Sequence, residues 1–153
     1  MADPTIADTL RELHARGIIA RWVLPGMRLV DDGAARSWVV IYTDDEGAEL
    51  TRDDLRPAPG EVCDADFHYW EDVETWRLAD DPVTVAALIV LVREAWDTPA
   101  LVPTRERDAG WVIADGLCSS MLVGGRYLRG PTELDAMHAA LRARLVVRPG
   151  GDA

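Results

Sequence analysis

The sequence predicts an α+β fold in a single domain, with a central apolar helix, two further helices and short antiparallel strands or hairpins. The central helix is predicted from residues 83–92, which include one polar residue and no charge. Runs of β-branched and aromatic residues lie on both sides of it, separated by Gly, Pro and Asp turns. Since 153 residues with 48% apolar content support one core but not two, we expect a compact domain over residues 1–148 and a flexible tail over 149–153.

The first predicted element is a helix over residues 4–16. Ile6, Leu10 and Leu13 recur on one face of such a helix, and that face is expected to be buried. Gly17 follows as a stop signal, since glycine readily adopts the left-handed conformation that ends many helices.

Short strands are predicted next. Residues 21–24 and 27–30 are expected to form two short strands, or one bent strand, because a Pro-Gly pair separates them. Residues 37–43 have the highest β-branched and aromatic content of the chain, so they are predicted to form an interior strand.

The following part contains more turn residues than strand residues. Residues 44–47 predict a hairpin turn and residues 48–51 a return strand, while the prolines and glycine of residues 57–60 are expected to stop further pairing. Residues 63–78 fit both a helix face and a strand alternation. Extended structure is the interpretation favoured here.

The central helix has clear start and stop signals. Asp81 can cap it, Pro82 suits its first turn, and Thr98 and Pro99 follow its end. A helix that is apolar on all sides has to be covered by other elements, so both flanks are expected to pack around it. Its apolar run is about 15 Å long, roughly half the hydrocarbon thickness of a bilayer, so it is not expected to cross a membrane. With no export signal at the N-terminus, a cytoplasmic location is predicted.

Strand pairs and a last helix are predicted for the remainder. Residues 100–103 and 110–114 are expected to pair around a charged turn, and residues 120–123 and 126–128 to form a second pair. A capping signal at Thr132 predicts a helix that ends near residue 145. Its expected buried stripe consists of Leu134, Met137, Leu141 and Leu145.

All of the excess charge lies in one quarter of the chain. Residues 44–81, named here the acidic stretch, contain 14 acidic side chains and three Arg, a local net charge of −11, and the other residues sum to zero. Affinity for nucleic acid depends on cations that neutralise phosphate, so direct nucleic-acid binding is disfavoured. A basic, Arg- or Lys-rich protein surface is the expected partner.

The sequence therefore predicts a non-enzymatic acidic interaction protein that masks a basic surface, in an inhibitor, immunity-type or nucleic-acid-mimic role. Its aromatic residues can contact Arg and Lys through cation–π interactions at the centre of an interface. The alternative is that the acids are merely solvated and the rings cover the central helix. The expected partner-binding residues are Asp44, Asp45, Glu46, Asp64, Asp66, Trp70, Glu71, Asp72, Glu74 and Trp76.

A metal-dependent enzyme or ligand-binding domain is the alternative function. Cys63, Asp66 and His68 lie close together in sequence and combine soft and hard ligand types. Zinc sites normally draw paired ligands from two places, and neither His14 nor His138 has a second ligand at i+4, so a solvated stretch with a buried cysteine is favoured and no cofactor is predicted.

Several catalytic chemistries are excluded by composition. The chain contains no Lys, so it has no Schiff-base lysine, no phosphate-loop lysine and no Ser-x-x-Lys site. No serine stands in a nucleophile-elbow motif, so binding is favoured over catalysis. The chain also contains no Asn and no Gln, which fits a GC-rich genome and a bacterial or phage accessory protein.

Overall fold

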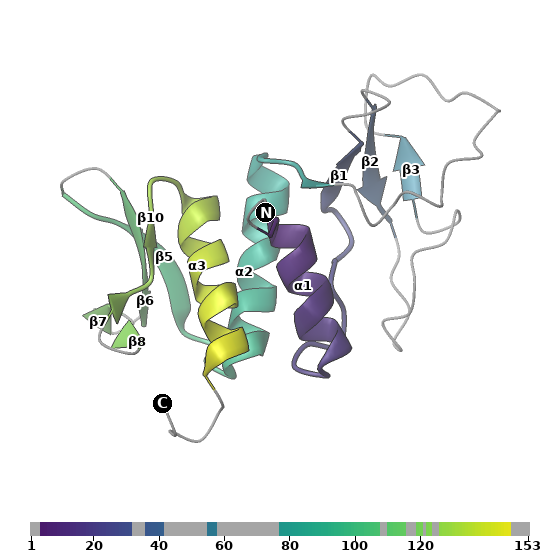
Figure 1. The fold of residues 1–153 in the computed structure, drawn as a ribbon. Coiled ribbons are helices and arrows are strands. Elements are labelled where there is room, and N and C mark those ends of the chain that lie inside the picture. The colour runs from purple at the N-terminus through teal and green to yellow at the C-terminus, as the bar shows by residue number, and fades with distance from the viewer. Residues whose placement is uncertain are drawn as a thin grey trace. The chain divides into compact units, whose positions relative to one another are not determined.

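The protein has an α+β fold, as the sequence predicts (Figure 1). The computed structural model describes residues 4–31, 36–41, 55–57, 77–107, 110–115, 119–120, 122–123 and 126–147. These residues form three helices and small antiparallel sheets. The chain divides into two compact units, Met1–Ala87 and Leu88–Ala153, and the boundary falls inside helix α2 (Pro82–Trp96). The single domain and the central place of the apolar helix stay predictions.

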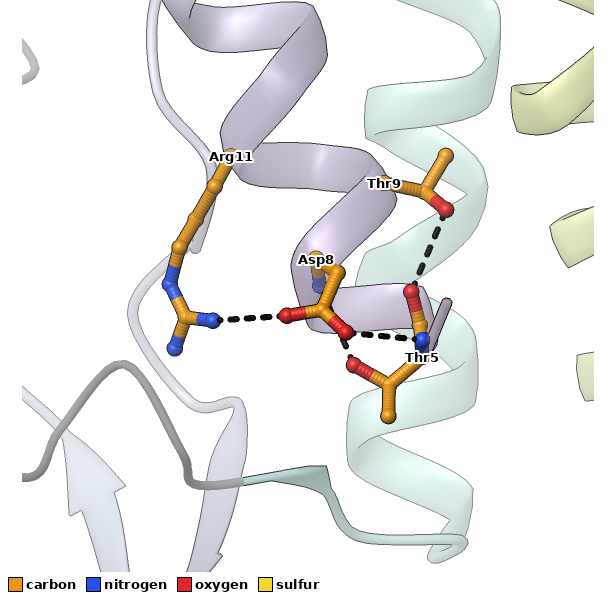
Figure 2. A network of polar contacts seen from close by, with 4 residues as sticks. All are labelled: Thr5, Asp8, Thr9 and Arg11. Atoms are coloured by element: carbon orange, nitrogen blue, oxygen red, sulfur yellow. Dashed lines mark hydrogen bonds and ion pairs between the residues drawn. The ribbon is translucent and has the colours of Figure 1, made fainter. Parts of the chain in front are cut away.

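Helix α1 (Ile6–Ala15) starts at a reciprocal cap (Figure 2). The Asp8 N–H donates to the Thr5 hydroxyl at 3.1 Å, and the Thr5 N–H donates to the Asp8 carboxylate at 2.9 Å. The Thr9 hydroxyl donates to the Thr5 carbonyl, and Arg11 pairs with the other Asp8 oxygen at 3.4 Å. Backbone donors at the helix start, which have no partner inside the helix, are thereby satisfied.

The end of α1 confirms the stop signal. Gly17 has φ +73°, its N–H donates to the His14 carbonyl, and the Ile18 N–H donates to the Leu13 carbonyl. These two bonds define a Schellman motif, which needs a left-handed residue where Gly17 stands. Leu10 and Leu13 are fully buried, as predicted for this helix face, whereas Ile6 is half-buried.

The first unit contains an antiparallel sheet of four short strands in the order β3-β2-β1-β4. The strands are β1 (Arg28–Asp31), β2 (Arg36–Val40), β3 (Leu55–Pro57) and β4 (Arg77–Leu78). Strand β2 lies between β1 and β3, and its Trp38 and Val40 are buried. The described part of the predicted interior strand is therefore confirmed.

The prediction of a strand over residues 21–24 is wrong. Trp22 and Val23 are buried there, but the segment forms no strand. The chain turns at Pro25 instead: Gly26 has φ +95°, and the Met27 N–H donates to the Leu24 carbonyl at 3.1 Å. Proline followed by a residue with positive φ is the pattern of a type II turn, and such a turn redirects the chain before β1.

Strand β3 differs from the prediction that pairing stops at Pro57, since β3 includes that residue. Pro57 lies on the outer strand of the sheet, where a missing N–H is tolerated. The extended structure favoured for residues 63–78 is confirmed at its described end, strand β4. The predicted turn over residues 44–47 and return strand over 48–51 lie outside the described residues.

Helix α2 confirms both of its predicted boundaries. The Thr84 N–H donates to the Asp81 carboxylate at 2.7 Å, which caps the start. At the other end, Asp97 has φ +49°, and its N–H and that of Thr98 donate to the carbonyls of Glu94 and Arg93. Asp97 therefore occupies the left-handed position that glycine fills more often.

The second unit contains an antiparallel sheet built on β6. Strands β5, β7 and β10 all pair with β6, and β8 pairs with β9 in a separate hairpin. The first predicted strand pair is confirmed with shifted boundaries. The second is confirmed for β8 and β9, whereas Ser120 pairs with β6 instead. The strands are β5 (Leu101–Arg105), β6 (Trp111–Asp115), β7 (Ser119–Ser120), β8 (Leu122–Val123), β9 (Arg126–Tyr127) and β10 (Arg129–Gly130).

Helix α3 (Glu133–Val146) packs on this sheet (Figure 1). The Asp135 N–H donates to the Thr132 hydroxyl at 3.1 Å, so the predicted cap is present. Met137 and Leu141 of the predicted stripe are fully buried. The prediction is wrong for Leu134 and Leu145, which are half-buried.

Arg144 occupies the buried face of α3 instead, together with two alanines, and is only 7% exposed. Its Nε donates to the Ala95 carbonyl at 2.7 Å and its Nη1 donates to the Val147 carbonyl at 2.6 Å. Both carbonyls lie at helix C-termini, where the negative end of the helix dipole favours a cation. The guanidinium is therefore stabilised where an apolar side chain was expected.

Gly130→Ala is expected to destabilise the protein by about 2–3 kcal/mol, because a Cβ at this position overpacks the contact between β10 and α3. That Cβ would lie 2.6 Å from the backbone nitrogen of Ala136, and it would also collide with Asp135. Chemical denaturation measures the loss. The control is Gly17→Ala, where no atom lies within 4 Å and only the positive φ opposes the change, at about 1 kcal/mol. An equal or smaller loss for Gly130→Ala would contradict this packing.

Candidate functional site

The residues that carry the predicted chemistry lie outside the described part of the chain. They are the partner-binding candidates Asp44, Asp45, Glu46, Asp64, Asp66, Trp70, Glu71, Asp72, Glu74 and Trp76, and the metal-ligand candidates Cys63, Asp66 and His68. The structure instead describes the framework that carries them, which consists of strands β2, β3 and β4 and the start of α2.

The acidic residues join this framework at two different ends of one sheet. Val40 lies opposite Leu55, so residues 42–54 leave the sheet and return to it at the end of β2. At the other end of β3, Pro57 lies opposite Trp38. Because β3 and β4 run in opposite directions, residues 58–76 leave the sheet and return to it at the end where β1 stops. The two points of attachment on β3 are about 7 Å apart, the length of two strand residues.

These two segments differ in composition. Residues 42–54 contain six acidic side chains and one Arg, whereas residues 58–76 contain six acidic side chains and no Arg. Both candidate anchors, Trp70 and Trp76, belong to the second segment, as do Phe67 and Tyr69. Acidic side chains are thus equally numerous in the two segments, while most of the aromatic residues belong to the second.

Asp81, the last acid of the acidic stretch, stabilises the start of helix α2. One of its oxygens accepts the Thr84 N–H at 2.7 Å, and the other lies 3.9 Å from Nη1 of Arg28. Asp80 is exposed, and no polar contact is shown for it among the described residues. Of these two neighbouring acids, Asp81 is therefore the one that the described contacts assign to the fold.

Arg28 stabilises the fold through its backbone hydrogen bonds more than through its charge. Its N–H donates to the buried Thr84 hydroxyl at 2.9 Å, and its carbonyl accepts the Ala79 N–H at 2.9 Å. The pair with Asp81 is long and partly exposed, so it stabilises by no more than about 1 kcal/mol. Its Nε is buried and has no hydrogen-bond partner among the described residues, which costs a similar amount or more.

Sequence reasoning missed the role of Thr84. In the sequence Thr84 is the one polar residue of an apolar run, and in the structure it is fully buried and its hydroxyl accepts a hydrogen bond from β1. A lone hydroxyl in an apolar helix was the available signal, since a buried polar group needs a partner.

Among the described residues there is neither a metal-ligand cluster nor a membrane-spanning helix. No group of three or more His, Cys, Asp or Glu lies close enough among them to hold a metal ion. Nor does any helix in the described ranges have the length and apolar character needed to span a bilayer. His14 is half-buried with Nδ1 3.4 Å from the Ile19 carbonyl, and His138 is half-buried on α3.

No protein-family model, curated protein or solved structure matches the chain. No residue role is therefore transferred from a relative. The proposal for its function therefore rests on the charge and chemistry of the chain itself.

Asp81→Ala is expected to lower the free energy of unfolding by about 1–2 kcal/mol, because it removes the cap of α2. Asp80→Ala is the matched control, with an expected change within about 0.5 kcal/mol for an exposed side chain. Denaturant unfolding of both variants measures the difference. Equal losses for the two variants would show that Asp81 does not cap the helix in solution.

Proposed function

We propose that this protein binds a basic protein surface through its acidic stretch and thereby masks that surface, without catalysing a reaction. The observation that carries the proposal is the division of charge. Unit Met1–Ala87 contains 19 acidic side chains and eight Arg, whereas unit Leu88–Ala153 contains eight of each. The whole net charge of −11 therefore belongs to one unit.

Such a distribution favours association with a cationic partner. Summed charges of one sign attract a partner of the opposite sign over long distances and raise the association rate, and salt weakens this attraction. Short-range binding needs anchors as well, and the acidic stretch supplies Trp70 and Trp76 beside carboxylates. Indole rings bind Arg and Lys through their faces, so the same stretch offers both attraction and contact.

The partner class follows from these charges. Surfaces that bind nucleic acid are rich in Arg and Lys, and a chain that presents dense carboxylates competes with phosphate for them. An inhibitor, an immunity-type partner or a mimic of nucleic-acid phosphate would each act in this way. Direct binding of this chain to nucleic acid is disfavoured by the same charges.

The test compares two variants of equal net charge. The first changes Asp64, Asp66, Glu71, Asp72 and Glu74 to their amides. The second makes the same change at five acids outside the acidic stretch, Glu12, Glu94, Asp97, Asp115 and Glu133. Each variant and the native protein are immobilised and exposed to lysate of the source cell at about 50 mM and about 500 mM salt.

The proposal expects a specific protein that is captured at low salt by the native chain and by the second variant, and that is lost with the first. An arginine-rich peptide is then used as a defined probe for the affinity of all three proteins. Equal binding by the two variants would show that only total charge matters. No specific capture by the native chain at either salt would end the proposal.

The metal-binding alternative rests on Cys63, Asp66 and His68, which offer a thiolate, a carboxylate and an imidazole within six residues of sequence. If these residues form a site, a calorimetric titration with Zn²⁺ or Mg²⁺ gives heat with the native chain and much less with Asp66→Ala. Absence of heat in both proteins is expected if the acidic stretch binds protein only.

A further inference from the structure

Strand β5 is the outer strand of its sheet, since β6 pairs with it on one side and no described residue pairs with it on the other. The outer edge of a strand presents unpaired N–H and C=O groups, to which a strand of another molecule can add. Leu101 and Val102 give β5 an apolar start, which favours such pairing if the edge is open.

The backbone groups on this outer edge belong to Leu101, Pro103 and Arg105. In an antiparallel pair, alternate residues bond to the partner strand and the others point away from it. The Glu106 N–H donates to the Gly110 carbonyl. By alternation, the backbone N–H and C=O groups of the even-numbered residues of β5 therefore point toward β6. The Ile113 N–H, opposite Pro103, donates to the Leu128 carbonyl on the far side of β6, which agrees with that alternation.

Two side chains obstruct part of this edge. Nε of Arg93 donates to the Leu101 carbonyl at 2.8 Å, so an incoming strand would have to compete with a cation for that acceptor. The Leu101 N–H also has a partner, the Thr98 carbonyl, at the longer distance of 3.4 Å. Pro103 has no N–H to offer. Among the described residues, no hydrogen bond is shown to the Pro103 carbonyl or to the backbone groups of Arg105, which is exposed and charged.

We propose that Arg93 and Pro103 protect the outer edge of β5 from pairing with a second copy of this chain. Identical strands can pair antiparallel about a two-fold axis, which is the commonest symmetry of protein dimers. In that arrangement Pro103 would face its counterpart in the second copy, and both central N–H donors would be missing. Leu101 would face Arg105, but its carbonyl is already bound to Arg93.

This inference is independent of the proposed function, because it concerns the second unit and none of the acidic stretch. It explains why a proline stands in the middle of a five-residue strand: at an outward position the missing N–H weakens no bond to β6. It also gives the Arg93 side chain a role in protecting the edge of β5.

The test is sedimentation velocity of the native chain, Pro103→Val and the double variant Arg93→Ala/Pro103→Val over a wide concentration range. The double variant is expected to self-associate at least about tenfold more tightly than the native chain, a change equivalent to two or more restored hydrogen bonds. Pro103→Val alone is expected to shift in the same direction by less. That single variant keeps the test decisive if the double variant is unfolded.

Two controls separate edge pairing from general loss of structure. Pro99→Val and Arg142→Ala change the same residue types at exposed positions off the edge and are expected to behave like the native chain. Adding Arg105→Pro to the double variant places a proline at another outward position and is expected to restore native sedimentation. Native sedimentation of a folded double variant, or association that survives Arg105→Pro, would overturn the proposal.

Discussion

The hydrogen bond between the Arg28 N–H and the buried Thr84 hydroxyl connects β1 to α2 across 56 positions of sequence. Thr84 is itself fixed through its N–H, which donates to Asp81. The Arg28 carbonyl accepts the Ala79 N–H, so β4 is attached at the same place. The acidic stretch therefore ends where strand and helix are bonded to each other, and its last residue is part of that junction.

Much of the fold could be predicted because the chain carries strong local signals. Helix α1 followed from the spacing of Leu10 and Leu13 and from Gly17, and α2 followed from Asp81 and from the residues after its end. The hairpin of β5 and β6 followed from two β-rich runs around a charged turn. In each case propensity, pattern and end signals agreed, which is the condition under which local reasoning succeeds.

The errors occurred where tertiary contacts decide. Trp22 and Val23 are buried without belonging to a sheet, which no alternation pattern reveals. Pro57 was interpreted as a stop although an outer strand accepts proline. Arg144 is buried because carbonyls at two helix ends receive its guanidinium, and only the packed structure brings those carbonyls together. The candidate site could be located only as charge in sequence, since its residues lie outside those described.

The two acidic segments, residues 42–54 and 58–76, are joined to opposite ends of the sheet of the first unit. The most direct measurement is an NMR titration of isotope-labelled protein with an arginine-rich peptide, followed amide by amide at low and high salt. Masking of a basic surface predicts shifts concentrated in those two segments, larger in the one that contains Trp70 and Trp76, and reduced by salt. Shifts spread evenly over the chain, or concentrated in Leu88–Ala153, would contradict it.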